Sequence, residues 1–321
     1  MLNSSPPTLA EFQRAATLLQ EVVQPMPLVP LHRHQGDSSV LLKTEVYQPV
    51  HSFKIRGVWY AVASLDRQRR QAGVSTVSAG NTAQALAWAA HRFGVPARSL
   101  MPDSAPASKV QAVEAYGGEP VLVPVDELFR YLREQLWEQE PYAFIHPWTN
   151  RDVLIGHGTI GLEIHNELPE VETIFIPVGG GGLLGGVASA LKSLRPQVRI
   201  IAVEPEGCPA LARSLDAGRP VSVACNTICD GVAVPYITEE MFPLLQRLVD
   251  RVALVSEEDV RSAIRILAVG NKMVAEPSGA LATAAALALP HQERGLSVCL
   301  VTGGNLNPAS FADIVAGNDP L

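Results

Sequence analysis

The strongest constraint on the fold is a regular alternation of two local patterns along the chain. Short runs rich in Val, Ile and Leu, typical of buried strands, alternate with longer stretches of helical periodicity. The predicted strands are 40–45, 74–79, 97–102, 120–125, 173–178, 199–205, 251–256 and 296–304, and the predicted helices include 82–92, 107–116, 151–167, 183–194 and 257–269. This order indicates an α/β fold, in which helices cover both faces of parallel sheets. Because ligands bind beyond the carboxyl ends of the strands in such sheets, the residues that follow strands are the first candidates for a site.

Size and composition narrow the class of protein. A chain of 321 residues can form one large core or two lobes with a cleft between them. Hydrophobic residues make up 47% and charged residues 18%, which predicts a compact globular protein. The net charge of −7 gives no electrostatic footprint for nucleic acid. No apolar run reaches membrane-spanning length, and the Ala-rich stretch 280–289 is bounded by Pro277 and Pro290, so we expect a buried helix there.

The cysteines and the N-terminus bear on the cellular compartment. Cys208, Cys225, Cys229 and Cys299 form neither a CxxC pair nor a Cys/His zinc spacing. Residues 1–12 have no basic segment followed by an apolar one, as a secretion signal would. We therefore expect reduced thiols in a cytoplasmic protein.

The stretch "IPVGGGGLLGG", residues 176–186, carries the clearest chemistry. A predicted strand runs into four consecutive glycines and then into a helix. Glycines allow the backbone to approach a ligand closely, and a helix N-terminus presents unpaired N–H groups. The pattern predicts a phosphate cradle, although a glycine-rich turn also serves tight packing of a helix on a sheet.

The same stretch also satisfies a dinucleotide-binding pattern. Gly180, Gly182 and Gly185 fit G-x-G-x-x-G, and Glu204 ends the next strand. A nicotinamide- or flavin-dependent oxidoreductase is therefore an open alternative. Against it, the pattern normally lies near the start of its nucleotide-binding unit, whereas here a long segment precedes it.

A lysine in apolar surroundings is the second feature. "PVHSFKIRG", residues 49–57, places Lys54 between Phe53 and Ile55. Burial lowers the pKa of a lysine, and Ser52 as the cap of a helix beginning at Phe53 would act in the same direction. A lysine that loses its proton readily can form a Schiff base; the other interpretation is an ordinary lysine on a solvated helix face.

Two further turns follow predicted strands. "VSTVSAGN", residues 74–81, places a Ser-Ala-Gly-Asn turn before a helix, where backbone N–H groups could hold a carboxylate and Asn81 could donate to a phenolate-type oxygen. "CLVTGGN", residues 299–305, places Thr302 at a strand end. Each turn alone is ordinary. Together with the glycine loop and Lys54, they describe a pyridoxal phosphate site that binds an amino acid.

The sequence resembles the fold-type II pyridoxal phosphate enzymes, in particular the threonine/serine dehydratase and serine racemase branch. The resemblance rests on "SFKIRG", "SAGN", "MPDSAPASKVQAVEAYGGE", "HGTIGLEI", "PVGGGGLLGG", "VEPEG", "DGVAV" and "AEPSGA", in that order along most of the chain. It implies two doubly wound lobes of the tryptophan synthase beta type, with the cofactor in the cleft between them. The small lobe would span 51–146, and the large lobe 1–50 plus 147–321. A homodimer is expected from the resemblance alone.

The resemblance also implies roles for individual residues. Lys54 would carry the cofactor as a Schiff base and move the Cα proton. The other cofactor contacts would be Phe53, Asn81, Gly179, Gly180, Gly181, Gly182, Leu183, Gly231, Glu276 and Thr302, with Thr302 facing the pyridine nitrogen. The substrate carboxylate would lie against Ser78, Ala79, Gly80, Asn81 and Thr82.

The expected reaction is β-elimination. A hydroxyl such as that of Thr302 cannot keep the pyridine nitrogen protonated, which suits expulsion of a leaving group from the neighbouring carbon. The enzyme would convert a β-hydroxy-α-amino acid (L-threonine, L-serine or a larger analogue such as phenylserine) to a 2-oxo acid and ammonia. An amino acid racemase is the alternative on the same cofactor; Ala79 disfavours it, because similar racemases have a proton-donating serine there. A catalytically inactive amino acid-binding module is a third possibility, and the retained Lys54 argues against it.

Departures from the family pattern leave two questions. His51 and Thr82 replace residues usual beside the amino acid site, which suggests a larger or aromatic β-substituent; His51 is equally consistent with an ordinary surface or core histidine. Metal-dependent relatives use positions that match Glu204, the Cys208 carbonyl and Ala210. Ala210 cannot be a ligand, so a divalent or monovalent cation there stays an open expectation.

Overall fold

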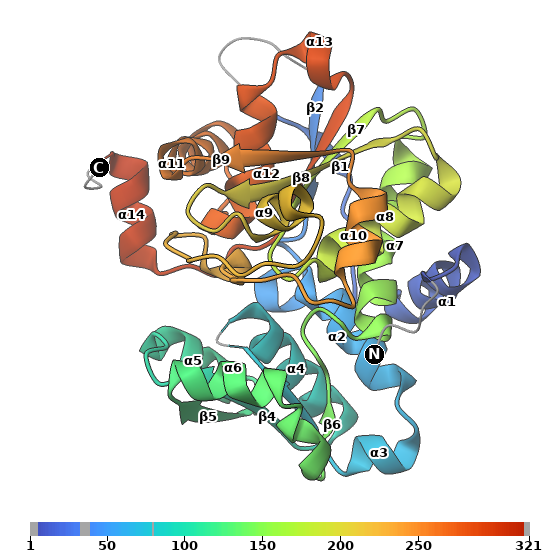
Figure 1. The fold of residues 1–321 in the computed structure, drawn as a ribbon, viewed down its shortest axis with the longest axis vertical. Helices are drawn as coiled ribbons and strands as arrows, with labels where there is room; N and C mark the ends of the chain where they lie inside the picture. Colours follow the sequence, from blue (N-terminus) through green and yellow to red (C-terminus); the bar gives the residue numbers. More distant parts are fainter. Residues whose placement is uncertain (1–5, 33–38, 79, 318–321) are drawn as a thin grey trace.

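The computed structural model describes residues 6–32, 39–78 and 80–317, which form two mainly parallel sheets with their helices (Figure 1). The strands are β1 (Leu28–Pro30), β2 (Val40–Thr44), β3 (Val74–Val77), β4 (Ala97–Pro102), β5 (Glu119–Val123), β6 (Ala143–Phe144), β7 (Thr173–Pro177), β8 (Arg199–Pro205), β9 (Arg251–Val255) and β10 (Ser297–Val301). The α-helices are α1 (Leu9–Leu19), α2 (Lys54–Ser64), α3 (Arg67–Gln71), α4 (Asn81–Phe93), α5 (Ala107–Ala115), α6 (Val125–Arg133), α7 (Arg151–Glu167), α8 (Gly182–Leu194), α9 (Ala210–Ala217), α10 (Phe242–Leu248), α11 (Glu257–Arg265), α12 (Pro277–Ala288), α13 (His291–Arg294) and α14 (Pro308–Ala316). Short turns of helix are η1 (Pro49–His51), η2 (Leu136–Gln139), η3 (Asp230–Val232) and the π-helical η4 (Ile266–Gly270).

The larger sheet has six strands in the order β1-β2-β10-β7-β8-β9. Every neighbouring pair is parallel except β1 with β2. Its strands alternate side chains between two apolar layers, as strand geometry requires. Ile174 and Ile200 pack against α7, α8 and α10, whereas Phe175 and Ile201 pack against α11 and α12. The sheet is therefore buried on both faces.

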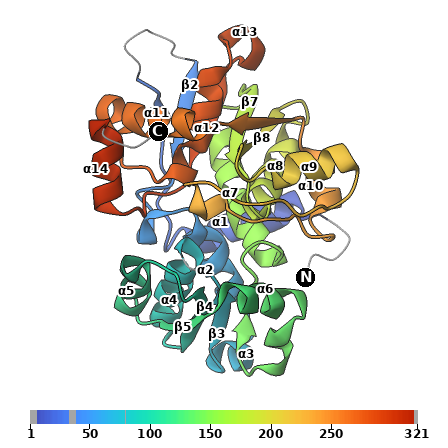
Figure 2. The same ribbon diagram turned by 60° about the vertical axis from the view of Figure 1, so that its left-hand side comes forward.

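The smaller sheet has four parallel strands in the order β5-β4-β3-β6. Helices α4 and α5 cover one face and α6 covers the other, and Figure 2 shows these elements grouped below the larger sheet. Helix α2 contacts both α7 and α4 and thus lies between the two sheets. The predicted lobe boundaries at residues 51 and 146 remain a prediction.

The eight predicted strands and the helices between them are confirmed in type and place, with ends shifted by a few residues. The expected Ala-rich helix is α12, and its apolar residues are buried. Ser52 does not cap α2. The helix begins at Lys54 after Phe53, and the extended Ser52 pairs instead with Gly303 in a β-bridge.

The expectation of four reduced thiols is wrong in this structure. Cys208 and Cys225 form a disulfide, with 4.4 Å between their Cα atoms, while Cys229 and Cys299 are free and buried. The chain returns beside the turn after β8, where Asn226 N donates to Gly207 O at 2.9 Å, and this brings the two sulfurs together. Separately, none of the helices among the described residues is long and apolar enough to cross a membrane.

Candidate active site

A cleft of about 230 Å³ opens between the two sheets, at the carboxyl ends of their strands. The small-sheet side contributes the turn after β3 and one residue of α5, and the large-sheet side contributes the loops after β7 and β10. The predicted site residues among its lining are Phe53, Lys54, Ser78, Gly80, Asn81, Thr82, Gly179, Gly180, Gly181, Gly182, Leu183, Gly231, Glu276 and Thr302. The structure thus brings together stretches that are far apart in the sequence.

Lys54 is the first residue of α2, where its side chain enters the cleft. The backbone before it is fixed, because Phe53 N donates to Thr302 O at 3.0 Å. The Lys54 Nζ lies 5.0 Å from the centroid of the Phe53 ring. Burial lowers the pKa of Lys54 to about 8, although the nearby Glu276 carboxylate acts in the opposite direction. An amine with this pKa is partly neutral near pH 7 and can attack an aldehyde.

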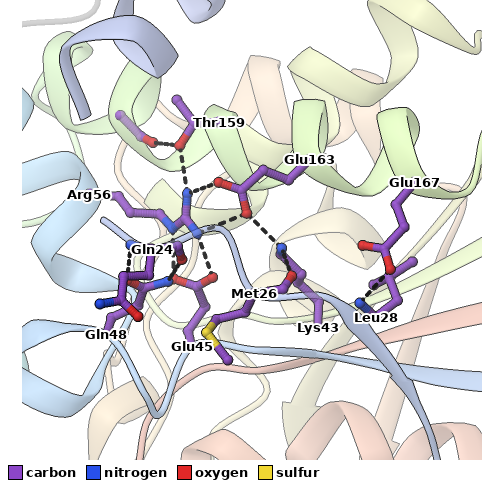
Figure 3. Close-up of polar contacts among 11 residues, drawn as sticks. Gln24, Met26, Leu28, Lys43, Glu45, Gln48, Arg56, Thr159, Glu163 and Glu167 are labelled. Atoms are coloured by element: carbon purple, nitrogen blue, oxygen red, sulfur yellow. Dashed lines mark hydrogen bonds and ion pairs between the residues drawn. The ribbon is translucent and has the colours of Figure 1, made fainter. Parts of the chain in front are cut away.

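The opposite face of α2 is held by a buried charge network (Figure 3). Arg56 donates to both Glu45 oxygens at 2.7 and 2.8 Å, and to both Glu163 oxygens at 2.6 and 3.0 Å. Arg56 Nη1 also reaches the Thr159 hydroxyl at 3.1 Å, and Lys43 Nζ lies 2.6 Å from Glu163. Because these partners lie on β2, on the turn after it and on α7, the network attaches the start of α2 to the large sheet.

The glycine loop connects β7 to α8 with very little space around it. A Cβ on Gly180 would lie 2.4 Å from the Trp148 ring, and one on Gly179 would lie 3.0 Å from the Val232 backbone. Gly181 has a φ of +90°, which favours glycine. Gly185 N donates to Gly181 O at 2.8 Å, so the preceding N–H groups at the start of α8 have no intrahelical acceptor. This is the geometry of an anion cradle.

Two elements meet across the cleft at Asn81 and Glu276. Asn81, the first residue of α4, donates its Nδ2 to Glu276 Oε1 at 2.7 Å and accepts from Asn305 Nδ2 at 2.8 Å. Burial raises the pKa of the Glu276 carboxyl to about 7, and the Asp230 carboxylate adds to this shift. Beside it, the buried Ser278 hydroxyl has no hydrogen-bond partner among the described residues. The cleft therefore contains polar groups that a ligand could satisfy.

The turn 78–82 supplies the other helix N-terminus. Gly80 N donates to Ser78 Oγ at 3.2 Å, and a Cβ on Gly80 would meet nothing within 4 Å. The first N–H groups of α4 have no intrahelical acceptor, so a carboxylate could bind at this end of the helix. Ala79 lies outside the described residues, so its expected effect on racemisation stays a prediction.

His51 does not join this group. Its side chain is exposed, its ring Nδ1 lies 3.3 Å from Val46 O, and it is not part of the cleft lining. The positive φ of 54° at His51 turns the chain before Ser52 enters the sheet edge. The predicted contact between His51 and the substrate therefore has no support from the cleft.

Glu204 lies at the end of β8, where its carboxylate meets the start of a helix. Its carboxylate accepts hydrogen bonds from Leu211 N at 2.7 Å and Ala212 N at 2.9 Å, at the start of α9. Glu204 therefore caps α9, and it is not part of the cleft lining that the glycine loop shares, which argues against a dinucleotide there; its predicted part in a cation site with the Cys208 carbonyl stays a prediction. Across the described ranges, no three His, Cys, Asp or Glu side chains gather where they could hold a metal ion.

Four residues of the cleft lining have polar or aromatic side chains that the sequence did not indicate. They are Lys109, Trp148, Asp230 and Ser278. Lys109 and Asp230 form an ion pair, and Trp148 fills the space above Gly180. Lys109, Asp230 and Ser278 lie in stretches that carry the family resemblance, which is the one signal that could have found them.

The residues present fit pyridoxal phosphate. The glycine loop offers N–H groups for the phosphate, Lys54 offers an amine of lowered pKa, and the buried Ser278 hydroxyl lies close to Thr302, whose Oγ1 is 3.5 Å from Ser278 O. A parallel-sheet protein of two lobes with this set of groups in its cleft is a fold-type II pyridoxal phosphate enzyme in architecture.

Comparisons with known proteins agree. The model of the pyridoxal-phosphate dependent enzyme family matches residues 19–303. The L-threonine ammonia-lyase of Thermotoga maritima is 38% identical over 306 residues, which cover 94% of this chain and 76% of that protein. Maize serine racemase superposes with a TM-score of 0.88 at 30% identity, covering 98% of each chain. Threonine deaminase isoform 2 of Solanum lycopersicum, in its processed form, gives 0.88 at 33% identity, covering 99% of this chain and 91% of that one. The chain belongs to the pyridoxal-phosphate dependent enzyme family.

Proposed function

We propose that this protein is a pyridoxal phosphate-dependent lyase that removes water from a β-hydroxy-α-amino acid and yields a 2-oxo acid and ammonia. The observation that carries the proposal is the position of Lys54. Its amine, with a pKa lowered to about 8, lines the same cleft as an anion cradle at α8 and a second helix N-terminus at α4. The relationship to threonine ammonia-lyase and threonine deaminase supports the same activity.

Different residues of the cleft would hold the cofactor and the substrate. The N–H groups of 179–183 would hold the phosphate, and the ring would be held by Phe53, Asn81, Gly231, Glu276 and Thr302, which line the same cleft. The turn 78–82 binds the amino acid carboxylate. When bound, pyridoxal phosphate supplies an electron sink for the charge that develops at Cα.

Lys54 acts as the base. Its amine accepts the Cα proton as the bond from Cβ to the hydroxyl oxygen breaks, and the resulting ammonium returns that proton to the hydroxyl, which leaves as water. A general base works best when its pKa lies near the operating pH, which the burial of Lys54 provides. The enzymatic product hydrolyses to the 2-oxo acid and ammonia.

The experiment is a product assay on cofactor-loaded protein. L-threonine, L-serine, threo-phenylserine and 3-hydroxyaspartate are each scored for 2-oxo acid and for the opposite enantiomer. We expect oxo acid with little inversion, and no product from Lys54→Ala. Inversion without oxo acid would instead support the racemase, which the similarity to maize serine racemase keeps as the second candidate.

Three further expectations, on the lobe boundaries, the oligomeric state and the compartment, complete the proposal. The small lobe comprises 51–146, the protein is a homodimer, and it acts in the cytoplasm; the second rests on the family resemblance. The Cys208–Cys225 disulfide argues against the cytoplasmic expectation, because disulfides are rare in a reducing compartment. Light scattering tests the homodimer. Thiol titration of protein isolated under alkylating conditions tests whether the disulfide is present in the cell, and thereby tests the cytoplasmic location.

A further inference from the structure

The two sides of the cleft are joined near its mouth by an ion pair between Lys109 and Asp230. Lys109 lies on α5, which packs with α4 on the small sheet, and Asp230 begins η3, which contacts α12 on the large sheet. Both side chains line the cleft. The Lys109 side chain is 21% exposed and that of Asp230 is 55% exposed. The pair therefore reaches from one lobe to the other at the edge of solvent.

This contact lies outside a second bridge between the same sides. Deeper in the cleft, Asn81 Nδ2 donates to Glu276 Oε1 at 2.7 Å. The charges of Asp230 and Lys109 both act on Glu276, so the ion pair stands close to the reacting groups. Because α4 and α5 pack together, a movement of α5 is transmitted to α4, whose first residue, Asn81, makes the deeper bridge.

The exposure of the pair suits a contact that opens and closes. A partly exposed ion pair is worth little in free energy, because water and salt screen it. Such a pair cannot lock two lobes together permanently. It can shift an equilibrium between open and closed clefts by about two- to fivefold.

We propose that Lys109 and Asp230 are positioning residues that form a latch, which holds the small lobe closed over the bound amino acid. The latch rests on the proposed function only in that the occupant is an amino acid. It acts through lobe closure: closed lobes bring the carboxylate-binding turn 78–82 to Lys54 and exclude water from the cleft. It requires opposite charges at the two positions and not a particular residue at either one.

The competing explanation is a direct contact between Lys109 and the substrate carboxylate. In that case Asp230 would compete with the substrate for Lys109, and its removal would strengthen binding or leave it unchanged. The latch requires the two single substitutions to act in the same direction.

The test compares Lys109→Met, Asp230→Asn and the charge exchange Lys109→Asp/Asp230→Lys in the cofactor-loaded protein. The first readout needs no turnover: acrylamide, an uncharged quencher, measures access of solvent to the cofactor fluorescence. The second is the KM for L-serine or L-threonine, separated from kcat. Lys192→Met is the matched control, because the Lys192 side chain is also 21% exposed and pairs with Asp250 far from the cleft.

We expect both single variants to increase quenching and to raise KM by about two- to fivefold, with a smaller change in kcat. The charge exchange should restore both readouts, and high salt should reduce the difference between wild type and variants. The Lys192→Met control should match wild type. An effect of Lys109→Met that Asp230→Asn does not share, or a charge exchange that restores neither readout, overturns the latch. If no amino acid gives a 2-oxo acid, the proposed function fails, while quenching still decides whether the latch exists.

Discussion

Arg56 and Glu45 form a two-point ion pair that is almost wholly shielded from solvent, with Nε to Oε2 at 2.7 Å and Nη2 to Oε1 at 2.8 Å. Two residues before Arg56, and on the other side of the same helix, Lys54 enters the cleft. Residues two apart on a helix point in nearly opposite directions. The ion pair therefore fixes the helix from behind the amine that the reaction is proposed to use.

Replacing Arg56 by Met should destabilise the protein by about 3–5 kcal/mol, because Glu45 loses its buried partner and Glu163 keeps only Lys43. Burial already raises the pKa of Glu45 in the intact network, so an unpaired Glu45 carboxylate is costly. Urea denaturation measures the change. Arg151→Met, which breaks a more exposed pair with Glu11, is the control and should cost less than about 1 kcal/mol. Equal losses of unfolding free energy in the two variants would show that the Arg56 network stabilises the protein no more than the exposed pair does.

Replacing Gly180 by Ala should weaken binding of pyridoxal phosphate about tenfold. The new methyl group would lie 2.4 Å from the Trp148 ring, and overpacking of this kind costs about 1–3 kcal/mol. Fluorescence titration of the cofactor gives the dissociation constant. A second change, Trp148→Ala, removes the ring, so Gly180→Ala should cost less affinity in that background than in wild type. If Gly180→Ala costs as much affinity in the Trp148→Ala background as in wild type, the contact with Trp148 is not the cause.

Glu204 should make stability fall as the pH rises. Burial raises the pKa of its carboxyl from 4.5 to about 7, so the folded protein holds a proton that the unfolded chain releases. The contribution is fully present below pH 4.5 and is lost as the pH passes 7, by roughly 3 kcal/mol. We expect Glu204→Gln, which cannot ionise, to reduce the difference in unfolding free energy between pH 5 and pH 8. Glu276, whose pKa is also raised to about 7, stays as a common background in both proteins. An unchanged pH difference would mean that Glu204 ionises normally.

Reduction of the Cys208–Cys225 disulfide should lower the free energy of unfolding by about 3 kcal/mol, because the bond closes a loop with a sequence separation of 17. Denaturation with and without dithiothreitol measures this loss. Cys225→Ser should reproduce it in oxidising buffer and should be insensitive to dithiothreitol. Thiol titration of the unfolded, unreduced protein should find two free thiols, those of Cys229 and Cys299. Four free thiols would contradict the pairing.

The strands that the sequence predicted are those of four or more residues with a run rich in Val, Ile and Leu, whether fully buried or, like β5 and β9, partly exposed. Strands such as β7 and β10 are buried along their whole length and read as unbroken apolar runs. Strands β1 and β6 were not predicted, because three and two residues are too few to carry a period and their pairing comes from the sheet. Ser52 looked like a helix cap, but the β-bridge to Gly303 keeps it extended.

The site residues also divide into those that the sequence indicated and those that it did not. The glycine loop and Lys54 lie in motifs whose local chemistry is visible in the residues themselves. The pairing of Lys109 with Asp230, and the position of Trp148 above Gly180, depend on how separate elements approach one another. A bare sequence contains no local pattern for such contacts.

The strand order of the large sheet also bears on how the chain folds during synthesis. Strand β2 lies between β1 and β10, so its inner edge remains unpaired until residues 297–301 have left the ribosome. The four strands of the small sheet are complete well before then, by residue 144. We expect the small sheet to form on the nascent chain, while the first hairpin waits with an open edge for the last strand. Exposed strand edges favour pairing with other chains, so residues 40–44 present an aggregation-prone edge until the last strand has been made.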